Sequence, residues 1–102
     1  MTLVVILTVR DGALATFRAF ETKAAAVMAR YGGAIERAVV IPPRAAGEAL
    51  REVHVVTFPD ERALLAYRED PELKAAAGLR EASILATEIL VGEDGPAYEP
   101  PR

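Results

Sequence analysis

Residues 2–9, TLVVILTV, restrict the possible folds of this chain more than any other segment. The segment is almost wholly apolar and rich in β-branched side chains, a pattern typical of a strand that is buried on both faces. It is too short to span a membrane, and it runs directly into Arg10 and Asp11 without the basic region of a signal peptide. We therefore predict a central strand of a sheet, in a cytoplasmic protein without a membrane partner.

The composition indicates one globular domain around this strand. The chain has 102 residues, of which 52% are hydrophobic and 26% are charged, a balance that favours a folded core over disorder. The net charge is −3 and the basic residues do not cluster, so we expect no nucleic-acid partner. With no cysteine and a single histidine, the chain lacks the usual ligands of transition metals. We predict neither a metal nor another cofactor.

A long amphipathic helix is predicted after the first strand. Apolar residues recur at three- and four-residue steps from Leu14 to Tyr31, which places them on one side of a helix. Asp11 is the expected N-cap. The glycine pair at 32–33 is expected to end the helix, because glycine adopts the left-handed conformation without a Cβ clash.

The remaining elements follow from the same kind of pattern. Strands are predicted over residues 34–41, 52–58 and 84–91. Asp60 is the expected N-cap of a second helix, and Asp70 with Pro71 is expected to begin a further short helix. Gly78 is expected to end or weaken that short helix.

The resulting order, β-α-β-β-α-β, predicts a ferredoxin-like α+β domain with a four-stranded antiparallel sheet and both helices on one face. We expect this domain to cover residues 1–92 and the polar, proline-rich segment 93–102 to form a tail. The uncovered sheet face would expose apolar side chains in an isolated chain. Because such a surface is usually an interface, we predict a homodimer through the sheet face.

Residues 58–80, FPDERALLAYREDPELKAAAGLR, resemble a segment of the dimeric α/β-barrel superfamily. The resemblance is strongest to an uncharacterised bacterial family of unknown function, related to the antibiotic-biosynthesis-monooxygenase-like proteins. In that family a strand ends in Phe-Pro-Ser or Phe-Pro-Asp, which residues 58–60 match. A later Ser-Pro-Glu-Tyr motif is matched by Pro71 and Glu72, and an arginine beyond it by Arg80.

The chain departs from the family pattern at Tyr67, where tryptophan is usual, and at Arg68 and Leu73, where tyrosine is usual. The resemblance implies a dimeric ferredoxin-like barrel but leaves the activity open, because a shared fold does not fix function. The superfamily includes cofactor-independent monooxygenases that form quinones, haem-degrading enzymes and muconolactone-isomerase-like proteins. The chain lacks the Asn-Trp-His set of the haem-degrading members, which argues against haem.

His54 is the first candidate catalytic residue, because an imidazole can act as a base at neutral pH. Strand alternation places it on the same face as Glu52. If the polar residues of the sheet share a side, Glu88 lies two strands away, roughly 10 Å, and forms another wall of the same pocket. In the alternative interpretation, His54 is a partly buried interface residue that bonds to a carboxylate or backbone group.

Arg80 and Tyr67 are the other two candidate catalytic residues. The Arg80 guanidinium could hold a carboxylate or enolate with two hydrogen bonds, or it could pair with a glutamate and fix its helix to the sheet. Tyr67 could donate a proton or stack on a flat ligand, or it could lie at the edge of the core.

Three functions remain open at this point. The chain could bind a small anionic or aromatic organic ligand in a pocket lined by His54, Tyr67 and Arg80. It could be a cofactor-independent monooxygenase or isomerase that supplies a base and an anion-stabilising donor. It could also be a non-catalytic dimer that binds a protein partner. A pocket shared by the three side chains would favour the first two functions.

Overall fold

The computed structural model describes residues 1–101 and contains four strands and four helices. The strands are β1 (Thr2–Val9), β2 (Ala34–Ile41), β3 (Arg51–Thr57) and β4 (Ile84–Gly92). The helices are α1 (Leu14–Ala29), α2 (Glu61–Arg68), α3 (Pro71–Ala75) and α4 (Ala77–Ser83). The predicted β-α-β-β-α-β order is confirmed, with α2, α3 and α4 together in the place of the second helix.

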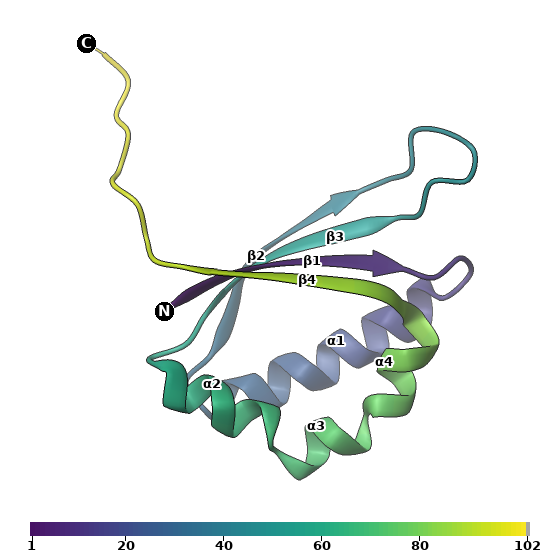
Figure 1. Ribbon diagram of the computed structural model, residues 1–102, viewed down its shortest axis with the longest axis horizontal. Coiled ribbons are helices and arrows are strands. Elements are labelled where there is room, and N and C mark those ends of the chain that lie inside the picture. Colours follow the sequence, from purple (N-terminus) through teal and green to yellow (C-terminus); the bar gives the residue numbers. More distant parts are fainter. Residues whose placement is uncertain (102) are drawn as a thin grey trace.

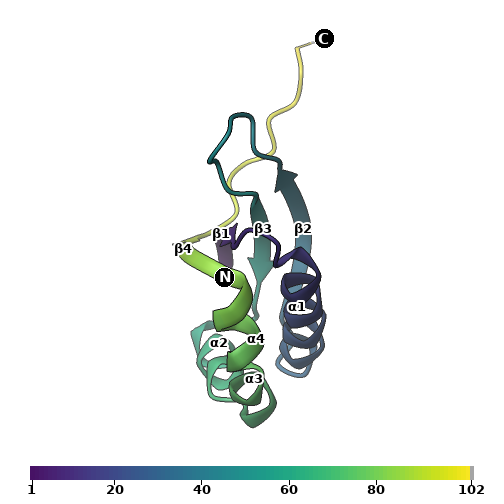
Figure 2. The same ribbon diagram turned by 90° about the vertical axis from the view of Figure 1, so that its right-hand side faces the viewer.

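The strands form one antiparallel sheet in the order β2-β3-β1-β4. The apolar strand β1 is central, as its composition predicts, because a strand with neighbours on both sides is the best protected from water. All four helices lie on the same side of the sheet (Figure 1). In Figure 2, α1 lies beside the group α2–α4, and α1 packs against α3 and α4. Both crossovers therefore cover the same face.

The register of the sheet decides which side chains face the helices. Val5 of β1 pairs with His54 on one side and with Ile89 on the other, so all three point toward the helices. The next residue, Ile6, pairs with Val53 and points away from them. We call this second side the open face; its apolar side chains are Val4, Ile6, Val39, Ile41, Val53, Val55 and Leu90.

The core beneath the helices consists of two separate clusters. The first core cluster contains Leu7, Val9, Phe17, Phe20, Ala24, Ala76 and Ile84. The second core cluster contains Leu3, Met28, Val56, Phe58 and Leu64. Val5, at the middle of β1, packs against both clusters. The helix-covered layer is therefore filled at its two ends and leaves room between them.

The predicted N-caps of the later helices agree with the structure, whereas the predicted N-cap of the first helix does not. Asp60 accepts a hydrogen bond from the Ala63 N–H at 2.8 Å, and Asp70 accepts one from the Glu72 N–H at 2.8 Å, so both predicted caps are confirmed. The predicted cap at Asp11 is wrong: α1 begins later, and Ala13 occupies the cap position without a side-chain hydrogen bond. Gly12, at φ 71°, turns the chain between Asp11 and the helix.

The region around Gly78 also differs from the prediction. The break between the short helices is at Ala76, and Gly78 lies inside α4, which the sequence pattern did not predict. The Ser83 hydroxyl donates to the Leu79 carbonyl at 2.6 Å within this helix. Beyond β4, residues 93–101 have no regular secondary structure. No helix within residues 1–101 is long and apolar enough to cross a membrane.

Gly33 lies where α1 turns into β2, and it has no room for a side chain. A Cβ added there would lie 2.5 Å from Phe58 Cε1 and 2.6 Å from Met28 Cγ, well inside van der Waals contact. We expect Gly33→Ala to lower the free energy of unfolding by about 1–3 kcal/mol, as overpacking of a core does. Urea denaturation followed by circular dichroism measures this change.

Gly78→Ala is the matched control, because a Cβ at Gly78 meets no atom within 4 Å and the residue is helical. Alanine should raise the free energy of unfolding there by about 0.5–1 kcal/mol. Equal effects of the two substitutions would contradict the close contact at Gly33.

Candidate functional site

A cavity of about 360 Å³ lies between the sheet and the helices, in the space between the two core clusters. Its walls are mostly apolar, and they include Leu3, Val5, Leu7, Phe20, Ala24, Met28, Val56, Phe58 and Leu64. Its polar lining consists of Glu21, His54, Tyr67, Arg68, Lys74, Arg80 and Thr87. Side chains from β1, α1, β3, the α2–α4 group and β4 therefore enclose one chamber.

All three predicted candidate residues line this cavity. His54 enters from β3 and is buried, Tyr67 enters from α2 and is half-buried, and Arg80 enters from α4 and is exposed. Glu88, in contrast, pairs with Ile6 and points to the open face. The prediction that Glu88 shares a pocket with His54 is therefore wrong, because the register of β4 against β1 places the two residues on opposite sides of the sheet.

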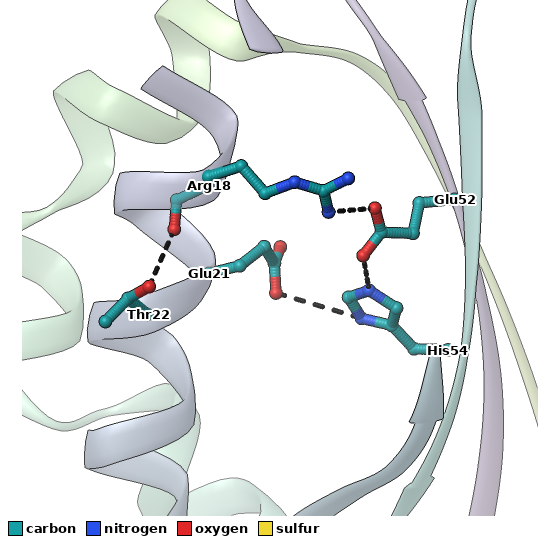
Figure 3. A network of polar contacts seen from close by, with 5 residues as sticks. All are labelled: Arg18, Glu21, Thr22, Glu52 and His54. Carbon is teal, nitrogen blue, oxygen red and sulfur yellow. Dashed lines mark hydrogen bonds and ion pairs between the residues drawn. The ribbon is translucent and has the colours of Figure 1, made fainter. Parts of the chain in front are cut away.

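His54 is held by a buried carboxylate (Figure 3). Its Nε2 lies 2.7 Å from Glu52 Oε1, and the Arg18 guanidinium binds the other oxygen of Glu52. Since a carboxylate only accepts hydrogen bonds, we assign the ring proton to Nε2, which donates to Glu52. In the neutral imidazole, the other ring nitrogen, Nδ1, carries a lone pair. This is the arrangement by which a carboxylate orients a histidine base.

Glu21 of α1 is a functional candidate that the sequence prediction missed. Its Oε2 lies 3.8 Å from His54 Nδ1, which is too far for a direct hydrogen bond (Figure 3). Burial raises the pKa of Glu21, and the neighbouring Glu52 charge adds to the rise, whereas His54, Arg80 and Arg18 oppose it. One signal was present in the sequence: Glu21 follows Phe17 by four residues, which puts it at the border of the apolar side of α1.

Tyr67 lies against the second core cluster and remains a hydrogen-bond donor. Its ring packs on Phe58, with centroids 5.4 Å apart. Burial, with the nearby Glu21 charge, raises the pKa of Tyr67 to about 12, although Arg80 acts in the opposite direction. The hydroxyl therefore keeps its proton at neutral pH.

Arg80 donates a hydrogen bond to the Thr87 hydroxyl at 3.1 Å, which joins α4 to β4. Within residues 1–101, Arg80 forms no ion pair. The alternative role predicted for Arg80, a salt bridge to a glutamate that fixes its helix to the sheet, is therefore not found among these residues. The Arg80 guanidinium therefore retains donors that can meet an anion.

The exposed lining residues mark the mouth of the cavity, and the buried ones mark its floor. At the mouth are three cationic side chains, Arg68, Lys74 and Arg80, of which Lys74 pairs with Glu69 at 2.6 Å. At the floor are His54, which is buried, and Glu21, which is half-buried. No group of three or more His, Cys, Asp or Glu side chains in the described part of the chain is arranged to hold a metal ion. The chamber thus combines apolar walls, a positive mouth, and the polar side chains of Glu21 and His54 at its floor.

Comparison with solved structures supports this architecture. The chain is similar to SnoaB, a cofactor-independent oxygenase from Streptomyces nogalater, with 22% identity over 92% of this chain and 93% of that one and a TM-score of 0.61. It is similar to a protein of unknown function from Rhodopseudomonas palustris, with 16% identity over 93% and 84% and a TM-score of 0.72. A dimeric protein of unknown function with a ferredoxin-like fold, from Bacteroides fragilis, shares 18% identity over 87% and 90%, with a TM-score of 0.57.

At these sequence identities, the similarity to the solved structures concerns the fold alone. None of the curated proteins matches the chain significantly. A family model gives a more specific result. The model of the domain of unknown function DUF1330 matches residues 3–93, which cover all but the first residue of the β-α-β-β-α-β unit. The resemblance carried by residues 58–80 is thereby confirmed, and the chain belongs to the DUF1330 family.

Proposed function

We propose that the protein binds a small organic molecule, with a flat apolar body and an anionic group, in the cavity between sheet and helices. The observation that carries this proposal is the meeting of His54, Tyr67 and Arg80 in one apolar chamber. Its volume of about 360 Å³ falls in the range of about 300–1,000 Å³ that is usual for small-molecule sites. Apolar walls with a few convergent polar groups are also typical of such sites.

The lining suggests how each part of the ligand is held. The aromatic rings of Phe20 and Phe58 and the aliphatic side chains of β1 favour a flat hydrocarbon body. Arg80, which is held by Thr87 and not by a carboxylate, is free to pair with an anionic group at the mouth. The protonated Tyr67 hydroxyl supplies a further donor beside it.

Isothermal titration with 2-naphthoate tests this proposal. Ala24, in α1, is buried and lines the cavity, so Ala24→Leu should fill the space and weaken binding by at least about tenfold. Ala19→Leu is the matched control on the same helix, since Ala19 is exposed and does not line the cavity. Unchanged affinity in the Ala24 variant, with its fold intact by circular dichroism, would place binding elsewhere and contradict the proposal.

A second candidate function is that of a cofactor-independent oxygenase or isomerase, and the geometry of His54 favours it. With Nε2 donating to Glu52, the His54 Nδ1 can take a proton from a carbon next to a carbonyl group. The electron pair of that C–H bond then moves toward the carbonyl oxygen, and the resulting enolate can accept hydrogen bonds from Arg80 or Tyr67. The enolate itself would react further, with molecular oxygen in an oxygenase. The likeness in fold to SnoaB is consistent with this chemistry.

Solvent exchange at an enolisable probe tests the second candidate. The protein should accelerate the replacement of the α-protons of 2-tetralone by deuterium in D₂O, as followed by proton NMR. His54→Gln should reduce the protein-dependent rate by at least about 100-fold, the usual contribution of a general base. Glu36→Gln, on the exposed strand β2, should leave the rate unchanged. An unaltered rate in the His54 variant would remove this candidate.

We also propose that the chain forms a homodimer through the open face. The central strands present Val4, Ile6, Val53 and Val55 there, and the edge strands add apolar residues of which Leu90 is half exposed. A second copy of the same face, related by a two-fold axis, would cover these residues with a surface of matching character. The dimeric state of the similar Bacteroides fragilis protein supports this arrangement.

Light scattering coupled to size-exclusion chromatography tests the dimer. At micromolar concentration the wild-type chain should elute with the mass of two copies. Val55→Lys should give monomers, because a dimer of this variant would bury an unpaired lysine charge from each copy in the interface. Val91→Lys is the matched control, since Val91 pairs with Leu3 and is exposed on the helix side of the sheet. A monomeric wild type would contradict the proposal.

A further inference from the structure

Two hydrogen-bond acceptors, His54 Nδ1 and Glu21 Oε2, face each other at the floor of the cavity. With Nε2 donating to Glu52, the His54 Nδ1 offers a lone pair, and Glu21 Oε2 faces it at 3.8 Å (Figure 3). Neither group reaches the other directly, and both line the same chamber. A ligand hydroxyl in the cavity, which has one proton, can donate to one of these acceptors or share the proton between the two. The floor is therefore suited to a hydrogen-bond donor.

The mouth of the cavity has the opposite character. Arg68, Lys74 and Arg80 are all exposed lining residues with positive charge. Arg80 is oriented by its hydrogen bond to Thr87, on the strand that borders the mouth. A carboxylate fits the planar array of guanidinium donors. The two polar regions of the chamber are thus suited to different groups of one molecule.

We infer that the cavity selects aromatic acids that also carry a hydroxyl group, with the hydroxyl on the Glu21–His54 pair and the carboxylate on Arg80. This inference rests on the proposed binding function. It adds that the ligand carries a hydroxyl group besides its carboxylate, and that the hydroxyl lies at the floor and the carboxylate at the mouth. Glu21 is then a specificity-determining residue. A desolvated carboxyl gains most from a new donor, which is consistent with the burial that raises the pKa of Glu21.

The expected selectivity follows from the cost of leaving polar groups without partners. A site that hydrogen-bonds a ligand hydroxyl rejects analogues that cannot donate, because an acceptor of the site is then desolvated and left without a partner. A methyl ether has the same oxygen but no proton, and it adds the bulk of a methyl group. An analogue with hydrogen in place of the hydroxyl adds no bulk and isolates the contribution of the missing donor.

Titration calorimetry with four naphthalene probes tests the inference. The wild-type protein should bind 6-hydroxy-2-naphthoate at least about tenfold more tightly than 2-naphthoate, 6-methoxy-2-naphthoate or 2-naphthol, since a hydrogen bond to a charged group contributes on that order. In Glu21→Met the advantage of the hydroxyl over the unsubstituted 2-naphthoate should disappear. Retained affinity for 2-naphthoate shows that the variant is folded with its cavity intact.

Two further variants separate the floor from the mouth. Arg80→Met should weaken 6-hydroxy-2-naphthoate and 2-naphthoate by a similar factor and leave 2-naphthol unchanged. Glu81→Met, at an exposed position of α4 outside the cavity lining, should bind all four probes as the wild type does.

Equal affinities for 6-hydroxy-2-naphthoate and 2-naphthoate would overturn the inference while the proposed binding function stands. A hydroxyl preference that persists in Glu21→Met would overturn the inference in the same way. If no probe binds to the wild-type protein, the proposed function and the inference fail together.

Discussion

The buried carboxylate of Glu52 is the constraint on which the candidate site depends. Removing an ionised carboxylate from water costs several kcal/mol unless it is paired and hydrogen-bonded. Here one oxygen is bound by Arg18 of α1 and the other accepts from His54 on the same strand. The pairing ties the long helix to β3 and fixes the direction of the imidazole ring. Without Glu52, the His54 ring would still enter the cavity from β3, but it would lose the hydrogen bond that holds its Nε2.

Most of the fold could be predicted because it depends on local patterns. The apolar run at residues 2–9 indicated the central strand, and Asp60 and Asp70 marked helix starts through side-chain hydrogen bonds that act within one turn. The errors occurred where a local signal had two interpretations. Asp11 has the chemistry of a cap, but Gly12 turns the chain before the helix begins. Gly78 was expected to end or weaken the short helix, but the helix breaks at Ala76 and a new one begins at Ala77.

The candidate site was less predictable, because it depends on the register between distant strands and on contacts between a helix and the sheet. Alternation alone placed His54 and Glu52 on one face, and the family resemblance pointed to Arg80. Alternation could not say on which face Glu88 lies, since a shift of one residue in pairing reverses every side chain of a strand. Glu21 was missed for a related reason: its partner is thirty-three positions further along the chain, on β3.

The division of the core into two clusters has a consequence for how such a protein can evolve. Each cluster packs helices against the sheet at its own end of the domain. The chamber between the clusters contains fewer such packing contacts, so it contributes less to the stability of the fold. Polar lining residues such as Glu21 and Arg80, which belong to neither cluster, can therefore be exchanged with little loss of the scaffold. Divergent relatives can then keep the same backbone and acquire different ligands.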